Sequence, residues 1–475
     1  MTHVPAGPAG AAGPAAGGAG GAEQGPAAGS PRAAGSWAAI LAGRRGRLLI
    51  GLLLTELVVA VQILIVITLL PAIVRDIGGI RLYGLALSVA ALAGIGAAPI
   101  AVRLLDRWGA RVVVPAGALL FACGALGAGL AQQMTELVAA RFLEGAGASA
   151  LEAIAISSVA VLYAGAERPK VMALGQLAWL IPAAAGPAVG SLALATVGWR
   201  WAFTASLLPL AVAMVLAGPN LGLLRPSDER PERGVTGPSL LLLAGLLAVV
   251  AGPTEGGPAG IVLAVAGAVL AAAAVRRIMP RGTLTMRPGL PVATMAMFCC
   301  SFAFFAVDGF VPLLLTAVDG RSVSAAGIVV TVAVLGWTAG GMIQARLARR
   351  GWTPARLLAT GGVLLVTGIA GTAGGLIPGA WLVPYLAWGV GAFGMGLAYT
   401  GAWLAAMDAQ SGPATGLAGP LVADRVGTAL GAGVGGVCVA VAAGAGLGIP
   451  GGIGIGLAVA AAGACTVIVA ARRMV

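Results

Sequence analysis

The 475-residue chain contains a single histidine, His3, which lies close to the N-terminus. The rest of the chain therefore cannot form a histidine-based zinc site, a histidine general base or a histidine proton relay. The five cysteines fall inside apolar segments without the spacing of metal ligands, so we interpret them as small packing residues. These absences predict that the chain is not an enzyme and has no metal and no cofactor.

Charged residues are also scarce, at 9% of the chain against about 25% in an ordinary soluble domain. Hydrophobic residues make up 59% of it, and apolar runs of about 17 to 25 residues recur from residue 48 onward. Each run matches the thickness of a bilayer, and the runs lack the alternation with period two that a membrane β-barrel shows. The sequence predicts an all-α polytopic membrane protein.

The apolar runs indicate fourteen spans, in the order six, two and six. The expected spans are 48–70, 82–102, 111–131, 136–163, 171–197, 200–221, 239–252, 259–275, 290–316, 323–345, 355–377, 380–405, 414–442 and 448–471. Because the middle pair is short, twelve spans plus a re-entrant hairpin over residues 239–275 are the alternative.

This order predicts two six-helix bundles with two extra central helices. The chain is expected to divide into a disordered Gly/Ala/Pro-rich tail, an N-terminal bundle, a cytoplasmic linker with the two extra helices, and a C-terminal bundle. Their respective bounds are 1–43, 44–224, 225–287 and 288–475.

Basic residues are expected mainly on one side of the membrane. With the N-terminus inside, 21 of the 28 Lys and Arg residues fall on the inner side, four on the outer side, and three in the tail or within spans. This bias follows the positive-inside rule and predicts cytoplasmic N- and C-termini. It also explains the net charge of +12 without a nucleic-acid partner. Lys170 is the only lysine, a bias that suggests a GC-rich genome and hence a bacterial inner (cell) membrane.

Ionisable residues inside the expected spans are candidate proton-coupling sites, since a charge at the centre of a membrane helix costs about 2.5–3.5 kcal/mol. The candidates are Arg141, Glu152, Asp308, Glu56, Glu144 and Asp424. Three of them, at positions 141, 144 and 152, share an arc of about 80° on one helix. Ion pairs are the alternative for Glu144 with Arg141 and for Asp424 with Arg425, whereas Glu56 can extend to the cytoplasmic surface.

Aromatic residues make up only 5% of the chain, yet several lie within or near the expected spans. Those assigned to a substrate cavity are Trp179, Phe302, Phe305, Trp337 and Trp403. The phenylalanines share the span 290–316 with Asp308, and an apolar wall around one acid favours amphipathic, cationic ligands. Packing within the protein core is the alternative.

Three motifs resemble those of the major facilitator superfamily, and specifically its fourteen-span drug–proton antiporter branch. VRLLDRWGAR (102–111) is similar to G-x-L-x-D-R-x-G-R-[KR], with Val and Ala replacing the first Gly and an Arg. RFLEGAG (141–147) is similar to R-x-x-[QE]-G-x-G, and GPAVGS (186–191) resembles the antiporter signature G-P-x-x-G-G. The resemblance covers about residues 48–471.

The resemblance implies roles for the residues of these motifs. It implies that Asp106, Arg107 and Gly109 belong to a charge latch that controls closure on the cytoplasmic side, and that Arg141 takes part in proton coupling. The residues of the antiporter signature, Gly186, Pro187 and Gly190, favour export over uptake.

The branch usually carries an Asp nine residues before a Leu-Pro pair of the first span, but here that place holds Gln62, which we assign to the cavity. The proton site is then expected at Glu56, Glu152 or Asp308.

We therefore expect a monomeric proton-coupled antiporter that exports small amphipathic molecules by alternating access. Its partners would be the substrate, protons and the lipid bilayer. A proton symporter that imports a nutrient or metabolite on the same fold is the alternative, and the direction of net transport distinguishes the two. A sensor or scaffold is disfavoured, because the sequence contains no soluble domain to report a signal.

Overall fold

The computed structural model describes residues 37–163, 167–224, 236–409 and 418–474. Most of the expected tail and the polar stretch 225–235 lie outside the described residues. Within the described ranges every regular element is a helix, as the sequence predicts.

The first group of helices, which we call the N-bundle, comprises α1 (Trp37–Leu41), α2 (Gly43–Ile77), η1 (Ile80–Leu82), α3 (Tyr83–Trp108), α4 (Ala110–Leu130), α5 (Met134–Leu162), α6 (Glu167–Thr196), α7 (Trp199–Thr204), α8 (Leu207–Ala217) and η2 (Gly218–Leu223). The central pair comprises α9 (Thr236–Glu255) and α10 (Gly257–Ile278). The second group, the C-bundle, comprises α11 (Leu290–Asp308), α12 (Val311–Ala317), α13 (Val323–Arg349), α14 (Pro354–Thr372), η3 (Ala373–Leu376), α15 (Leu382–Asp408), α16 (Ala418–Gly444) and α17 (Gly448–Arg472).

Twelve helical segments among the described residues are long and apolar enough to cross a membrane. Each coincides with one of the expected spans, which confirms a polytopic helical membrane protein. The other two expected spans fall on α5 and α6, which are 29 and 30 residues long but are not among the twelve.

The central pair α9 and α10 belongs to the twelve candidate spans. The two helices have 20 and 22 residues, so each is about 30 Å long at 1.5 Å per residue. They pack closely, since a Cβ added to Gly245 would lie 2.7 Å from the carbonyl oxygen of Gly267. This length matches two full spans better than the short re-entrant hairpin of the alternative.

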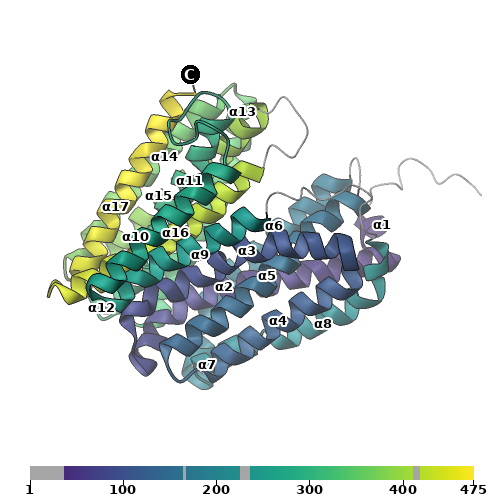
Figure 1. The fold of residues 1–475 in the computed structure, drawn as a ribbon, viewed down its shortest axis with the longest axis horizontal. Coiled ribbons are helices and arrows are strands. Elements are labelled where there is room, and N and C mark those ends of the chain that lie inside the picture. Colours follow the sequence, from purple (N-terminus) through teal and green to yellow (C-terminus); the bar gives the residue numbers. More distant parts are fainter. Residues whose placement is uncertain (1–36, 164–166, 225–235, 410–417, 475) are drawn as a thin grey trace, which may run out of the picture.

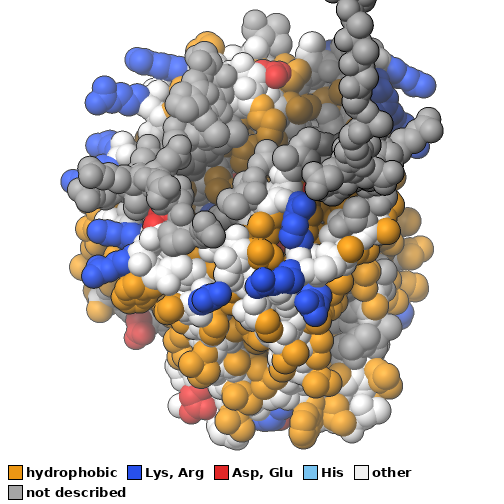
Figure 2. Space-filling view, turned by 90° about the vertical axis from the view of Figure 1, so that its right-hand side faces the viewer, with side chains coloured by type: hydrophobic (Ala, Val, Ile, Leu, Met, Phe, Trp, Pro, Cys, Tyr) orange, Lys and Arg blue, Asp and Glu red, His pale blue; other side chains and the backbone are white. Residues whose placement is uncertain are grey.

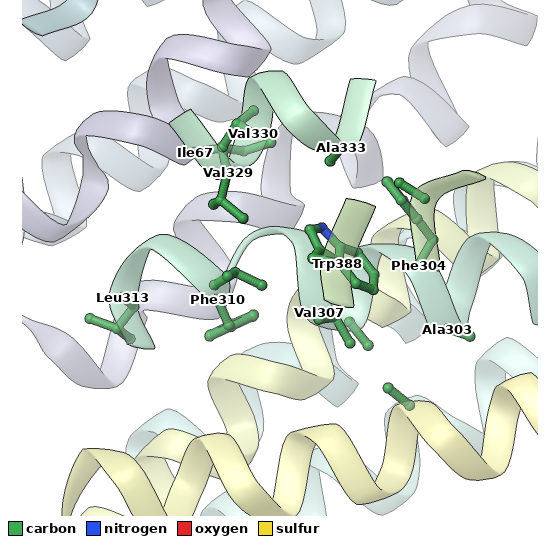
Figure 3. Packing of buried hydrophobic residues seen from close by; sticks show 14 of the residues in the cluster. Ile67, Ala303, Phe304, Val307, Phe310, Leu313, Val329, Val330, Ala333 and Trp388 are labelled. Atoms are coloured by element: carbon green, nitrogen blue, oxygen red, sulfur yellow. The ribbon is translucent and has the colours of Figure 1, made fainter. Parts of the chain in front are cut away.

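The two bundles meet at one end of the molecule, which we call the closed end, and spread apart toward the other (Figure 1). At the closed end Gly84 of α3 touches Gly436 of α16 so closely that neither has room for a Cβ. Ile67 of α2 lies in one apolar cluster with Val329 and Val330 of α13, so this cluster also spans the seam (Figure 3).

Arginine side chains gather at the opposite end, which we call the basic end. The basic helix termini there carry Arg103, Arg107, Arg111, Arg276, Arg277, Arg346, Arg349, Arg350, Arg356 and Arg472. Figure 2 views the side where the N-bundle reaches this end, and it shows several Lys and Arg side chains but few acids. The distribution agrees with the one-sided placement of basic residues that the sequence predicts.

Candidate functional site

An ion pair joins the two bundles. Arg425 of α16 in the C-bundle donates from Nη2 to Oε1 of Glu152 on α5 in the N-bundle, at 2.6 Å. The two side chains are 39% and 22% exposed, so the pair lies in a partly open part of the interface. Each bundle thus contributes one charge to the same site.

A second carboxylate from the N-bundle lies near this pair. Glu56 of α2 is half-buried and accepts a hydrogen bond from the Trp179 indole of α6 at 2.7 Å. It is also close enough to Glu152 and Arg425 to interact with both electrostatically. Trp179, expected in the substrate cavity, therefore lies beside an expected proton-coupling residue.

A third carboxylate comes from the C-bundle. Asp424 accepts a hydrogen bond from the Ser301 hydroxyl of α11 at 2.5 Å, and Tyr399 of α15 hydrogen-bonds to it as well. The Trp403 indole hydrogen-bonds to Tyr399 in turn. Asp424 therefore uses neutral donors, although it precedes Arg425 in the chain.

Three carboxylates and one guanidinium thus converge where the bundles face each other. We call Glu56, Glu152, Asp424 and Arg425 the central cluster. With all four groups ionised, the cluster carries a formal excess of two negative charges. Charges of this kind within membrane proteins are costly and mark ion or substrate pathways.

The position of the cluster along α16 shows how the bundles diverge. At Gly436 the backbones of the two bundles touch, whereas at Arg425, eleven residues nearer the basic end, two long side chains span the gap. Eleven residues correspond to about 16 Å of helix. The cluster therefore lies on the side of the bundle contact that faces the basic end.

Aromatic rings of the C-bundle adjoin the cluster. The ring of Trp337 lies 5.4 Å from Tyr399, 4.9 Å from Phe304 and 6.3 Å from Phe305. Phe302 stacks on Phe298 of the same helix at 5.8 Å. Of the aromatic residues expected in a cavity, Trp337 and Trp403 contact Tyr399, a hydrogen-bond partner of Asp424, and Trp179 contacts Glu56.

Asp308, the acid that the sequence associates with these rings, adjoins the same aromatic group through Trp388 and Phe304. It is buried at the C-terminal end of α11, where its carboxylate accepts a hydrogen bond from the Trp388 indole at 2.9 Å. Trp388 stacks on Phe304 with ring centroids 5.0 Å apart, and the two rings are neighbours in Figure 3. Asp308 therefore faces the interior of the C-bundle.

Three further candidates are buried inside the N-bundle. Arg141 and Glu144 form an ion pair at 2.7 Å with both side chains at most 4% exposed, which is the pairing that the sequence offers as the alternative. Gln62 donates from its amide to the Phe203 carbonyl at 3.0 Å and to the Ser206 hydroxyl at 2.9 Å. The structure places none of these three side chains in the central cluster.

Residues 52–445 of the chain match the model of the Major Facilitator Superfamily. The chain belongs to this superfamily. As a member it is a transporter and not an enzyme.

Several curated members of the superfamily are similar to the chain at low identity. The multidrug transporter protein MdtP of Bacillus subtilis is 27% identical over 209 residues, 44% of this chain and 37% of that protein's length. A probable multidrug-efflux transporter of Mycobacterium tuberculosis is 28% identical over 395 residues, which are 78% of this chain and 83% of the relative.

A solved structure with the same fold is a bacterial homologue of the human lysosomal transporter Spinster, in an inward-facing and unoccupied conformation. Its TM-score is 0.63 at 14% identity, over 91% of this chain and 98% of that chain.

The superfamily signature after the second span occupies the turn between α3 and α4. Gly109 connects the two helices with φ 74°, a conformation that favours glycine. Asp106 is half-buried and Arg107 is exposed, and no described residue forms an ion pair with Asp106. The latch that the resemblance implies at these residues stays a prediction.

The antiporter signature lies within α6. No described atom lies within 4 Å of a Cβ added to Gly186, and only a side-chain atom 3.9 Å away approaches one on Gly190. The side chain of Pro187 lies outside the described part of the chain. Contacts with the described part of the chain therefore give no reason for either glycine.

Sequence reasoning missed Ser301 and Tyr399 as members of the site, and it named Arg425 only as a partner of Asp424. The sequence marks Arg425 as a charge within a span, but its partner is 273 positions away. Serine and tyrosine are common in membrane helices, and nothing in the sequence distinguishes these two.

Proposed function

We propose that this transporter is a proton-coupled antiporter that exports small amphipathic molecules. The central cluster is the main support for this proposal. Both bundles contribute carboxylates to it, and it lies on the side of the bundle contact that faces the basic end. The efflux named in the description of the Mycobacterium tuberculosis relative supports the direction.

Within the cluster, Glu56 is best suited to exchange a proton for a cationic ligand. The Glu152 carboxylate already has the Arg425 guanidinium at 2.6 Å, whereas the hydrogen-bond partner of Glu56 is the neutral Trp179 indole. A half-buried carboxylate without a bonded cation gains most from binding a proton or a cationic group. In our scheme substrate binds while Glu56 is ionised, and protonation of Glu56 releases it on the far side.

The aromatic rings beside Asp424 would hold the apolar part of such a substrate. Trp337 and Tyr399 present flat apolar surface next to charged groups, and cations bind favourably over aromatic rings. A substrate with an aromatic body and one positive charge fits both features.

The membrane topology is part of the proposal. We infer that α5 and α6 also cross the bilayer, because they have the length of the other spans and pack against α3, α4 and α2. The chain would then have the fourteen spans of the drug–proton antiporter branch. The basic end would face the cytoplasm of a bacterium by the positive-inside rule, and the protein would act as a monomer.

Transport of ethidium into inside-out vesicles tests the proposal. With an acidic vesicle interior, the scheme predicts ethidium uptake that a protonophore and Glu56→Gln abolish. Glu255→Gln, a change at an exposed acid outside the cluster, serves as the matched control and should transport normally. Gradient-independent uptake would contradict proton coupling, and gradient-driven loss of solute from the lumen would indicate a symporter.

A further inference from the structure

The segment between the central pair and the C-bundle is rich in arginine. It joins α10, which ends at Ile278, to α11, which begins at Leu290, and it lies at the basic end. We call residues 279–289 the α10–α11 link. Exposed arginines of the link and of two adjoining helix ends form what we call the arginine patch. Its members are Arg276, Arg277, Arg281, Arg287, Arg472 and Arg473.

A hydrogen bond joins the end of α17 to the link. The Arg473 guanidinium donates from Nη1 to the Thr285 carbonyl at 2.6 Å, although the two residues are 188 positions apart. α11, which follows the link, also packs against α17. The end of α10, the link and the end of α17 therefore contribute arginines to one surface.

The link is folded into consecutive turns. The backbone N–H groups of Thr285 and Arg287 both donate to the Gly282 carbonyl, each at 3.2 Å. The Thr283 hydroxyl donates to the Pro280 carbonyl at 2.7 Å, and Thr283 is buried. The arginines of the link therefore project from a folded segment.

The patch is short of neighbouring acids. The sequence has no Asp or Glu from residue 256 to 307 or from residue 425 to 475. Among the described residues none of the six arginines forms an ion pair, whereas Arg45 near the start of α2 pairs with Glu167 at 3.1 Å. Guanidinium groups on one surface attract anions, and they bind phosphate oxygens in a bidentate manner. The patch thus favours an anionic ligand that contains phosphate.

One face of α10 connects exposed apolar residues to the patch. Val262, Val265 and Val269 are 67%, 59% and 64% exposed. At 100° per residue, these three valines and Arg276 fall within an arc of about 60°. Because α10 is a candidate membrane span, its apolar face meets acyl chains and its basic end meets headgroups. A lipid along this face would place its headgroup at Arg276.

The link adds an apolar side chain between its own two arginines. Leu284 is 65% exposed, and it lies three residues after Arg281 and three before Arg287. At a membrane interface, leucine binds among the acyl chains while adjacent arginines attract anionic headgroups. The link therefore repeats the combination of apolar and basic surface that α10 presents.

We propose that the arginine patch binds the headgroup of an anionic phospholipid. The guanidinium groups contact the phosphate, while Leu284 and the exposed face of α10 contact the acyl chains. Such a lipid tethers the link between the central pair and the C-bundle to the membrane surface. The inference requires neither proton coupling nor a direction of transport, so it stands or falls separately from the proposed function.

Lipid binding to the purified full-length transporter tests the site. Phosphatidylglycerol or phosphatidylcholine with the same acyl chains is added in detergent, and bound lipid is measured by native mass spectrometry. The parent should bind phosphatidylglycerol at least tenfold more tightly. Arg281→Gln combined with Arg287→Gln should weaken this binding about 25-fold, since each arginine near an anionic surface contributes a factor of about five. Binding of phosphatidylcholine should not change.

Arg346→Gln combined with Arg349→Gln is the matched control. Both arginines are exposed at the end of α13, also at the basic end but outside the patch, and the net charge changes equally. The control should bind phosphatidylglycerol as the parent does. Arg281→Lys combined with Arg287→Lys keeps the charge and should retain most of the affinity. Melting temperatures without added lipid show that each variant is folded, and Arg276→Gln gives a second test, with an expected loss of about fivefold.

Three results would overturn the proposal. Equal affinity of the parent for the two lipids would show that the site does not select negative charge. Equal losses in the link variant and the control would show attraction to the basic end as a whole. Glycerol phosphate, the headgroup without acyl chains, should not displace phosphatidylglycerol at equal concentration. Full displacement would assign the patch to a soluble anion.

Discussion

Arg425 and Glu152 lie 273 positions apart in the chain, yet their side chains form a 2.6 Å ion pair between the two bundles. The pair lies beside Glu56 and Asp424, so one guanidinium lies among three carboxylates. The excess of negative charge at the interface between the two bundles is the basis of the proposed function.

Removing one partner of this pair should impair transport more than removing both. Arg425→Gln leaves three carboxylates without a cation, and Glu152→Gln leaves a half-buried guanidinium. Neighbouring groups of this kind show interaction energies of about 0.5–3 kcal/mol. We expect the double variant to regain part of the ethidium transport lost in each single variant, and additive losses would contradict a direct pair.

The contact of Gly84 with Gly436 should tolerate no side chain. A Cβ at position 84 would meet the Gly436 backbone, and overpacking of this kind costs about 1–3 kcal/mol. Gly84→Ala should therefore favour the state that is open at the closed end. A cysteine at the buried position 313 detects this state by its labelling with a membrane-impermeant maleimide. Gly237→Ala, where no described atom lies within 4 Å, should leave labelling unchanged.

The spans could be predicted from the sequence because the bilayer imposes one length on every apolar run. The helix break at Gly309 was missed, although Pro312 marks it, since the residues on both sides are equally apolar. Hydropathy detects burial in lipid and not backbone continuity. The same holds for the split of the expected span 200–221 into α7 and α8.

The site could be predicted only in part. The shared arc of Arg141, Glu144 and Glu152 on α5 follows from helix geometry, but the first two pair inside the N-bundle while Glu152 reaches α16. Helical spacing predicts the direction in which each side chain points around the helix axis. It does not predict which neighbouring helix lies in that direction, because this neighbour changes along the helix. Tertiary packing therefore decides which charge faces the other bundle.

Gln62 acts as a donor, and an acid at this place should be harmful. Gln62→Asp would restore the residue usual in the antiporter branch but would turn a carboxylate toward the Phe203 carbonyl. The expected loss is about 1–3 kcal/mol of stability, measured as a lower melting temperature in detergent. Gln62→Asn introduces a side chain of the same size as Asp that is still a hydrogen-bond donor, so it should lower the melting temperature clearly less. Equal losses of stability in the two variants would show that only side-chain length matters.

The Trp179 indole should strengthen substrate binding by holding Glu56 in place. Hydrogen bonds to charged groups contribute about 1.5–3 kcal/mol, so Trp179→Phe should raise the Kd for ethidium about tenfold or more, as measured by fluorescence titration. Trp381→Phe is the control, since Trp381 is exposed just before α15 and lies outside the central cluster. Unchanged affinity in Trp179→Phe would separate this indole from the binding site.

The exchange of a proton for a cation at the central cluster is tested most directly by proton release. Tetraphenylphosphonium is added to the purified transporter in weakly buffered detergent solution, and the change in pH is recorded. Our account predicts release from the parent and from Glu255→Gln, but little from Glu56→Gln. Full release from Glu56→Gln together with its loss in Asp308→Asn would contradict the account and assign the proton to the buried acid of the C-bundle.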